Sequence, residues 1–194
     1  EKVITNSGYF QDYKHQLNVI SKSTATHSTL VLNNTSSTRF ERDKNGYMLA
    51  NKSFKILNKE FKKEDKFWFI KVSHDAYSKS NGVIHERQIK YFNENFKLEG
   101  CDKLIKTKKF KSSSFEIRFH LLPEINITKL LNNETILIES NNSGWKFTCK
   151  NHKIDIETGL YFGKKNKYLE NKNILIAGLT TSEEQNIFWE IEKI

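Results

Sequence analysis

His27 is the residue whose type and position in this sequence first suggest chemistry. It lies in the segment Ser23–Thr35, among small hydroxyl residues and shortly before the apolar run Leu30–Leu32. A strand that starts beside a histidine would hold the imidazole rigidly at the end of a sheet, as a metal ligand or a catalytic group requires. A histidine in this position can also be purely structural, so the pattern alone leaves both interpretations open.

A second candidate is His74, in the segment His74-Asp75-Ala76-Tyr77 that follows the apolar run Phe67–Ile70. An aspartate next to a histidine can orient or charge the imidazole. One interpretation is that His74 and Tyr77 face a binding cleft. The alternative is that they organise the end of a strand, with Tyr77 packed inside and His74 hydrogen-bonded to the backbone.

Arginine is rare in this chain, with 4 residues against 28 lysines, so its positions are informative. Arg118 and His120 lie on the polar face of the alternating segment Phe115–Leu121, where an arginine could contact a carboxylate. Arg87 instead shares an apolar strand face with His85. Since a buried arginine needs an acidic partner, we predict that Arg87 pairs with an acid on a neighbouring strand, and the alternative is a substrate carboxylate.

Alternation of apolar and polar residues with a period of two dominates the chain and predicts an all-β domain. Turn signals separate the alternating runs at short intervals, so one antiparallel multi-stranded β-sandwich over residues 1–194 is the predicted fold. Short helices are predicted only at Asp12–Ser21 and Asn126–Leu131. The expected strands include Ser28–Leu32, Tyr47–Ala50, Lys66–Ser73, Val83–Phe92, Phe115–Leu121, Glu134–Glu139, Trp145–Cys149, Lys153–Glu157, Asn173–Leu179 and Ile187–Ile191.

The net charge of +9 favours an acidic partner. Nucleic acid is not the expected one, because arginines interleaved with aromatic residues on one element are missing. No apolar run approaches the roughly 20 residues that a membrane-spanning helix needs. The spacing of Cys101 and Cys149 gives no metal motif, and it leaves a single disulfide between them open.

Taken in order, these segments resemble the C-terminal β domain of bacterial heparinase II/III-like polysaccharide lyases, from about Val3 to the last residue. The segments that carry the resemblance are His27-Ser28-Thr29, His74-Asp75-Ala76-Tyr77, Gly82-Val83-Ile84-His85-Glu86-Arg87, Ile117-Arg118-Phe119-His120, Gly144-Trp145-Lys146-Phe147 and Gly159-Leu160-Tyr161-Phe162-Gly163.

The resemblance implies part of an enzyme that cleaves acidic, uronate-containing polysaccharide by β-elimination. In this family an (α/α) toroid domain precedes the β domain and supplies most of the catalytic groups. We therefore expect this chain to be the C-terminal portion of a longer polypeptide and to have little or no activity by itself. A periplasmic or cell-envelope location follows from the resemblance only.

The resemblance also assigns roles to the candidate residues. His27 and His74 are predicted to be catalytic, and Tyr77, Arg118 and His120 are predicted to bind substrate. In some members the histidine that matches His27 helps to bind a structural zinc, with an upstream histidine and an acidic residue. Here the acidic position falls at Asn6, a much poorer zinc ligand, which puts zinc in doubt.

Two other functions remain open at this point. The chain could be a non-catalytic carbohydrate-binding or assembly module, for which exposed aromatic platforms would be the sign. It could also bind polyanions through lysine charge alone, which would give a shallow and strongly salt-dependent affinity.

Overall fold

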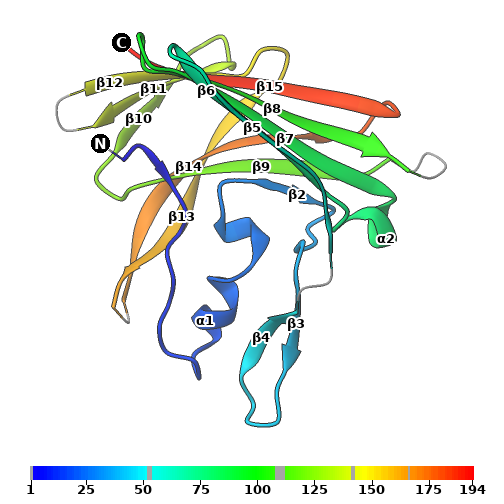
Figure 1. Ribbon diagram of the computed structural model, residues 1–194. Coiled ribbons are helices and arrows are strands. Elements are labelled where there is room, and N and C mark those ends of the chain that lie inside the picture. The colour runs from blue at the N-terminus through cyan, green and yellow to red at the C-terminus, as the bar shows by residue number, and fades with distance from the viewer. Residues whose placement is uncertain (1, 52–53, 108–111, 141–142, 166) are drawn as a thin grey trace.

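The computed structural model describes residues 2–51, 54–107, 112–140, 143–165 and 167–194 (Figure 1). Two antiparallel sheets make up most of the described chain, as Figure 1 shows, and they pack face to face. The prediction of an antiparallel β-sandwich is therefore confirmed.

The larger sheet has eight strands in the order β10-β11-β12-β15-β8-β7-β6-β5. In chain order they are β5 (Ile56–Lys63), β6 (Phe67–His74), β7 (Val83–Phe92), β8 (Lys97–Lys106), β10 (Asn126–Lys129), β11 (Thr135–Ser140), β12 (Ser143–Thr148) and β15 (Glu184–Lys193).

The smaller sheet has five strands in the order β1-β9-β14-β13, and β2 also pairs with β9. They are β1 (Ile4–Thr5), β2 (Leu30–Leu32), β9 (Ser114–Leu121), β13 (Ile154–Lys164) and β14 (Lys167–Leu179). The strands β1 and β2 pair with different parts of β9, so the segment between them, which contains His27, stays close to this edge of the sheet.

The core lies between the two sheets and follows from the alternation in the sequence. In β9 the side chains of Phe115, Ile117, Phe119 and Leu121 are at most 1% exposed, while Glu116 and Arg118 point the other way. The facing strand β15 contributes Trp189, whose ring lies 4.7 Å from that of Phe119.

Three short helical elements and a hairpin complete the fold. They are α1 (Gln16–Ile20), the 3-10 turn η1 (Thr24–Thr26), α2 (Ser78–Asn81) and the hairpin β3 (Arg39–Arg42) with β4 (Met48–Asn51). The helix α1 begins where the Nδ1 atom of His15 accepts from the Leu17 amide, at 3.1 Å. In Figure 1, α1 and the β3–β4 hairpin extend together below the sandwich.

Two expectations about local structure need correction. The segment Asn126–Leu131 is not a helix, because Asn126–Lys129 pairs with β11 and the sheet satisfies its backbone. The thiols of Cys101 and Cys149 are both buried and free, so they form no disulfide. Within the described residues, no helix is long and apolar enough to cross a bilayer.

Candidate functional site

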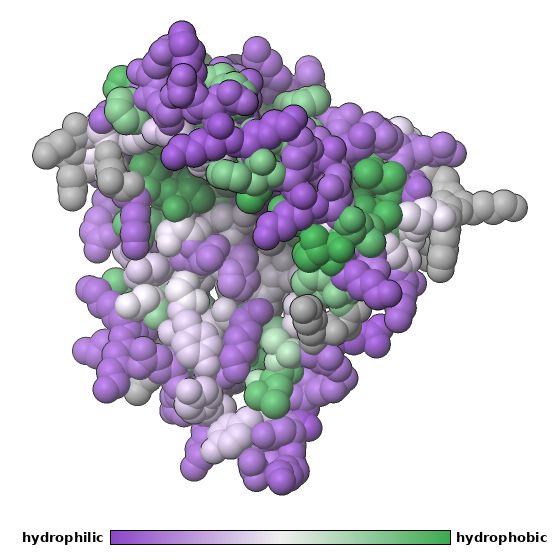
Figure 2. Space-filling view, in the orientation of Figure 1, coloured by the Kyte–Doolittle hydropathy of each residue, from purple (hydrophilic) through white to green (hydrophobic). Residues whose placement is uncertain are grey.

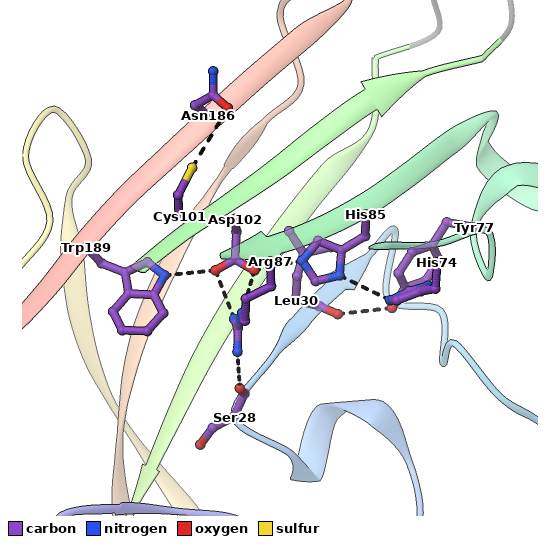
Figure 3. A network of polar contacts seen from close by, with 10 residues as sticks. All are labelled: Ser28, Leu30, His74, Tyr77, His85, Arg87, Cys101, Asp102, Asn186 and Trp189. Carbon is purple, nitrogen blue, oxygen red and sulfur yellow. Dashed lines mark hydrogen bonds and ion pairs between the residues drawn. The ribbon is translucent and has the colours of Figure 1, made fainter. Parts of the chain in front are cut away.

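The carboxylate of Asp102 is the centre of a buried polar network on the inner face of the large sheet (Figure 3). Its Oδ1 atom accepts from His85 Nε2 at 2.7 Å and Arg87 Nε at 2.8 Å. Its Oδ2 atom accepts from Arg87 Nη2 and Trp189 Nε1, both at 2.9 Å. Four donors therefore satisfy a side chain that is 0% exposed.

The ionised form of Asp102 is the stable one. Burial works against the charge, but the positive charge of Arg87 and then the hydrogen bond from His85 outweigh burial and hold the pKa of Asp102 far below its usual range. In the antiparallel register Arg87 lies directly opposite Asp102. The prediction that Arg87 pairs with an acid on a neighbouring strand is therefore confirmed.

Gly100 makes the contact from Trp189 to Asp102 sterically possible. The two residues are paired in the register of β8 and β15, and the indole lies over the glycine. A Cβ atom at Gly100 would approach the Trp189 ring to 2.1 Å, far inside van der Waals contact. The absence of a side chain at Gly100 thus allows the indole N–H to reach the carboxylate two residues along β8.

His74 and His85 extend the network toward the end of β6. The Nδ1 atom of His74 accepts from the Ala76 amide at 3.3 Å, which leaves the proton on Nε2. That Nε2 atom donates to His85 Nδ1 at 3.2 Å, and His85 in turn donates to Asp102. Burial, and then the nearby His85, lower the pKa of His74 to about 4, so the ring of His74 is neutral near pH 7.

Arg87 connects this network to the small sheet. Its Nη1 atom donates to the backbone carbonyl of Ser28, the residue after His27 (Figure 3). Three further bonds hold Ser28: its amide donates to Asn6 Oδ1, its hydroxyl donates to the Thr5 carbonyl, and the hydroxyl accepts from the His120 amide. The backbone at Ser28 is therefore fixed from both sheets.

His27 is the residue that this fixed backbone positions. It ends the η1 turn, where its own amide donates to the Thr24 carbonyl at 3.1 Å, and its carbonyl accepts from Thr29. Its ring is half-buried and makes no hydrogen bond to any side chain or backbone group in the described part of the chain. Burial lowers the pKa of His27, so the free imidazole is largely neutral near pH 7.

The other predicted site residues already have partners within the domain. Tyr77 is 0% exposed and its hydroxyl donates to the Leu30 carbonyl at 3.0 Å, while burial raises its pKa. Together with the Ala76 contact of His74, this packing favours the structural alternative for the segment that ends β6. The predicted catalytic role of His74 and the predicted substrate contact of Tyr77 stay predictions.

Arg118 and His120 lie near each other on β9 but are also engaged. Arg118 contacts Glu157 at 2.6 Å and Glu116 at 2.7 Å, so two carboxylates neutralise its charge. His120 is 3% exposed, and its ring bonds the Ser7 hydroxyl and the Ala25 carbonyl, both at 3.0 Å. Their contact with substrate stays a prediction too.

The residues near His27 do not fit a zinc site by themselves. Across the described segments, no three His, Cys, Asp or Glu side chains come together as a ligand set. The side-chain oxygen of Asn6 is near but already accepts from the Ser28 amide at 3.1 Å. One imidazole and one engaged amide oxygen fall short of the four ligands that structural zinc requires.

Asp102 is the functional residue that sequence reasoning missed. The segment Lys97–Lys106 does not alternate cleanly in the sequence, because Gly100 and Asp102 stand between Leu98 and Leu104 on one strand face. The sequence holds one indication of this residue: an arginine on the apolar face at position 87 needs an acidic partner, and Asp102 lies in the segment that follows β7.

The two sheets define an antiparallel β-sandwich domain, in which the Arg87–Asp102 pair contacts the segment that carries His27. The family model "Heparinase II/III-like, C-terminal" matches residues 1–190. The chain therefore belongs to this family, and the resemblance noted in the sequence is confirmed.

Solved structures of heparinases share the fold. Heparan sulfate lyase HepC from Pedobacter heparinus is 14% identical, with a TM-score of 0.77 over 100% of this chain. Two heparinase III structures are each 13% identical, with TM-scores of 0.75 over 99% and 0.68 over 100% of this chain. The chain spans 28% of the length of each of these proteins. A search of curated proteins finds no match.

Proposed function

We propose that this chain is the β domain of a polysaccharide lyase that cleaves uronate-containing polysaccharide by β-elimination. The observation that carries the proposal is the family match over residues 1–190. The upstream partner in this proposal is an (α/α) toroid domain of the same polypeptide, which supplies the remaining catalytic groups. The chain alone is then expected to have little or no activity.

β-Elimination sets three chemical requirements. The uronate carboxylate must be neutralised so that the C5 proton becomes acidic, a base must remove that proton, and an acid must protonate the departing oxygen. A neutral imidazole can serve as the base or as a hydrogen-bonding group at the sugar. Among the histidines discussed above, His27 meets this need because its ring is neutral and not engaged within the domain.

The network beneath His27 has a positioning role in this proposal. Arg87 and Asp102 do not touch the substrate, but they fix the carbonyl of Ser28 and so the orientation of the preceding residue. A catalytic group must be held in its productive geometry, because small misplacements cost large factors in rate.

The test is an elimination assay on the complete gene product that contains this chain, with the 194-residue chain alone for comparison. The substrates are a panel of uronate polysaccharides, and the readout is the ultraviolet absorbance of the new C4–C5 double bond. The proposal expects turnover by the gene product and a loss of about 10²-fold or more in His27→Ala, the range of general acid–base catalysis. If the gene product forms no C4–C5 double bond with any polysaccharide of the panel, the proposal is wrong.

A further inference from the structure

Two exposed tyrosines lie side by side where α1 and the β3–β4 hairpin extend from the sandwich. Tyr13 is 62% exposed and Tyr47 is 41% exposed. Their ring centroids are 5.9 Å apart in an edge-to-face arrangement. Figure 2 shows pale and green side chains gathered on this lower part of the molecule, among the purple of charged residues. Neither hydroxyl has a hydrogen-bond partner within the described residues.

Two surface hollows share this pair, because both tyrosines line each of them. The first, of about 260 Å³, is closed by Lys22, Met48 and Leu49. The second, of about 360 Å³, is lined by Lys14, Lys165 and Asp12. The tyrosine pair therefore belongs to both hollows, which are together called the groove below: Met48 and Leu49 line one of them, and the charged residues Asp12, Lys14 and Lys165 line the other.

The charged side chains along the groove are mostly lysines, and they have N–H donors left to bind a ligand. Lys14 and Lys165 are exposed and take part in no ion pair with another described residue. Lys22 donates to the Met48 carbonyl at 3.1 Å, which leaves two of its three N–H donors for a ligand. Asp12 is the one acid among the described lining residues, and its Oδ1 atom accepts from the Lys14 amide.

The groove is also held in shape before any ligand binds. Asn18, which is 1% exposed, donates to the Tyr9 hydroxyl at 3.0 Å and to the Phe10 carbonyl at 2.6 Å. The bond from Lys22 to Met48 connects the turn after α1 to the hairpin that carries Tyr47. A site whose walls are already ordered loses less conformational entropy on binding.

We propose that this groove binds a short stretch of acidic oligosaccharide, at a site separate from His27. The apolar faces of sugar rings pack on the tyrosines, whose free hydroxyls meet sugar hydroxyls. The sugar carboxylate or sulfate groups lie against Lys14 and Lys165. The choice of a saccharide rests in part on the proposed function. A single edge-to-face pair also gives no series of parallel platforms for successive nucleic-acid bases.

The test is calorimetric titration of the 194-residue chain, which requires no catalysis. The probes are a hyaluronan hexasaccharide, a heparin hexasaccharide, neutral cellohexaose and a short single-stranded oligodeoxynucleotide. We expect an acidic hexasaccharide to bind and the neutral one not to bind. Tyr13→Ala or Tyr47→Ala should weaken the affinity about tenfold or more, the equivalent of about 1.4 kcal/mol.

Matched variants separate ring stacking from charge and from general surface effects. Lys14→Gln with Lys165→Gln should weaken binding and flatten its salt dependence. Phe61→Ala is the control, since Phe61 on β5 is also 62% exposed but lies outside the groove. It should leave the affinity unchanged.

Three results would overturn the inference. The first is that neither acidic hexasaccharide binds. The second is that Phe61→Ala and Tyr13→Ala lose the same amount of affinity for the acidic hexasaccharide. The third is that the oligodeoxynucleotide binds more tightly than the hexasaccharides and that the tyrosine variants do not change its affinity. These outcomes are distinct from failure of the proposed function, because elimination is measured on the complete gene product and binding on this chain.

Discussion

The Nη1 atom of Arg87 donates to the backbone carbonyl of Ser28, so a residue inside the large sheet holds the chain next to His27 near the small sheet. The other edge of the same guanidinium is fixed by Asp102, which is 0% exposed. The position of His27 thus depends on a charge pair whose carboxylate is fully buried.

Removal of the carboxylate at position 102 should strongly destabilise the fold. Asp102→Ala leaves Arg87, which is 17% exposed, without its counter-charge, and breaking a buried pair in this way costs about 3–5 kcal/mol. Urea unfolding measures the change. Asp155→Ala is the control, because Asp155 forms its ion pairs at the surface with a 49% exposed side chain and should cost at most about 1 kcal/mol. Equal losses in the two variants would contradict the account.

Replacement of the guanidinium by an ammonium should loosen the segment that carries His27. Arg87→Lys keeps the positive charge but loses the planar fork that reaches both Asp102 and Ser28. A loss of about 1.5–3 kcal/mol in unfolding free energy is expected, typical of hydrogen bonds to charged groups. Amide hydrogen exchange at Thr29 should become faster, since its bond to the His27 carbonyl depends on this backbone. Unchanged exchange at Thr29 would show that Arg87 does not brace this segment.

A methyl group at position 100 should disturb the network through Trp189. In Gly100→Ala the new Cβ overlaps the indole, so the ring must move away and lose its bond to Asp102. Overpacking of this kind costs about 1–3 kcal/mol, and the near-ultraviolet circular dichroism of Trp189 should change. A variant with native stability and an unchanged spectrum would refute the packing described for Gly100.

Acid should destabilise the domain through its buried histidines. The pKa of His74 is lowered from 6.5 to about 4, so the unfolded chain binds a proton that the folded chain does not. The stability contribution is therefore complete above pH 6.5 and is lost as the pH falls toward 4. The lowered pKa values of His27 and His120 act in the same direction.

Urea unfolding between pH 7 and pH 4 measures this effect. The free energy of unfolding should depend less on pH in His74→Gln than in the wild-type protein. Titration of the His74 ring by NMR gives the direct check. A midpoint near 6.5 for His74 would contradict the burial and hydrogen bonds described for it.

The sequence predicts those strands best that alternate cleanly. The strand β7 has the predicted bounds, Val83–Phe92, which lie between the turn signal Ser80-Asn81-Gly82 and the next strand. In β9 the same pattern placed four apolar side chains in the core. A period of two is a local property, so it can be read without knowing the partner strands.

Features that depend on distant residues could not be read in this way. The strand β8 carries Gly100 and Asp102 on its inner face, and both make sense only beside Trp189 and Arg87 of the neighbouring strands. A short helix was predicted over Asn126–Leu131, but the backbone of Asn126–Lys129 pairs with β11 instead. For the same reason the partners of His120, and Glu157 beside Arg118, could not be predicted, since these residues lie far away in the sequence.

The most direct test of the account compares two properties of the complete gene product in three single variants, His27→Ala, His74→Ala and His152→Ala. The properties are kcat/KM for elimination and the free energy of unfolding. The account predicts that His27→Ala loses about 10²-fold or more in kcat/KM with little loss of stability. His74→Ala should lower stability, and the control His152→Ala, whose ring lies 6.1 Å from that of Phe115, should leave kcat/KM unchanged. Wild-type elimination by His27→Ala would contradict the claim that this chain contributes its free histidine to the active site.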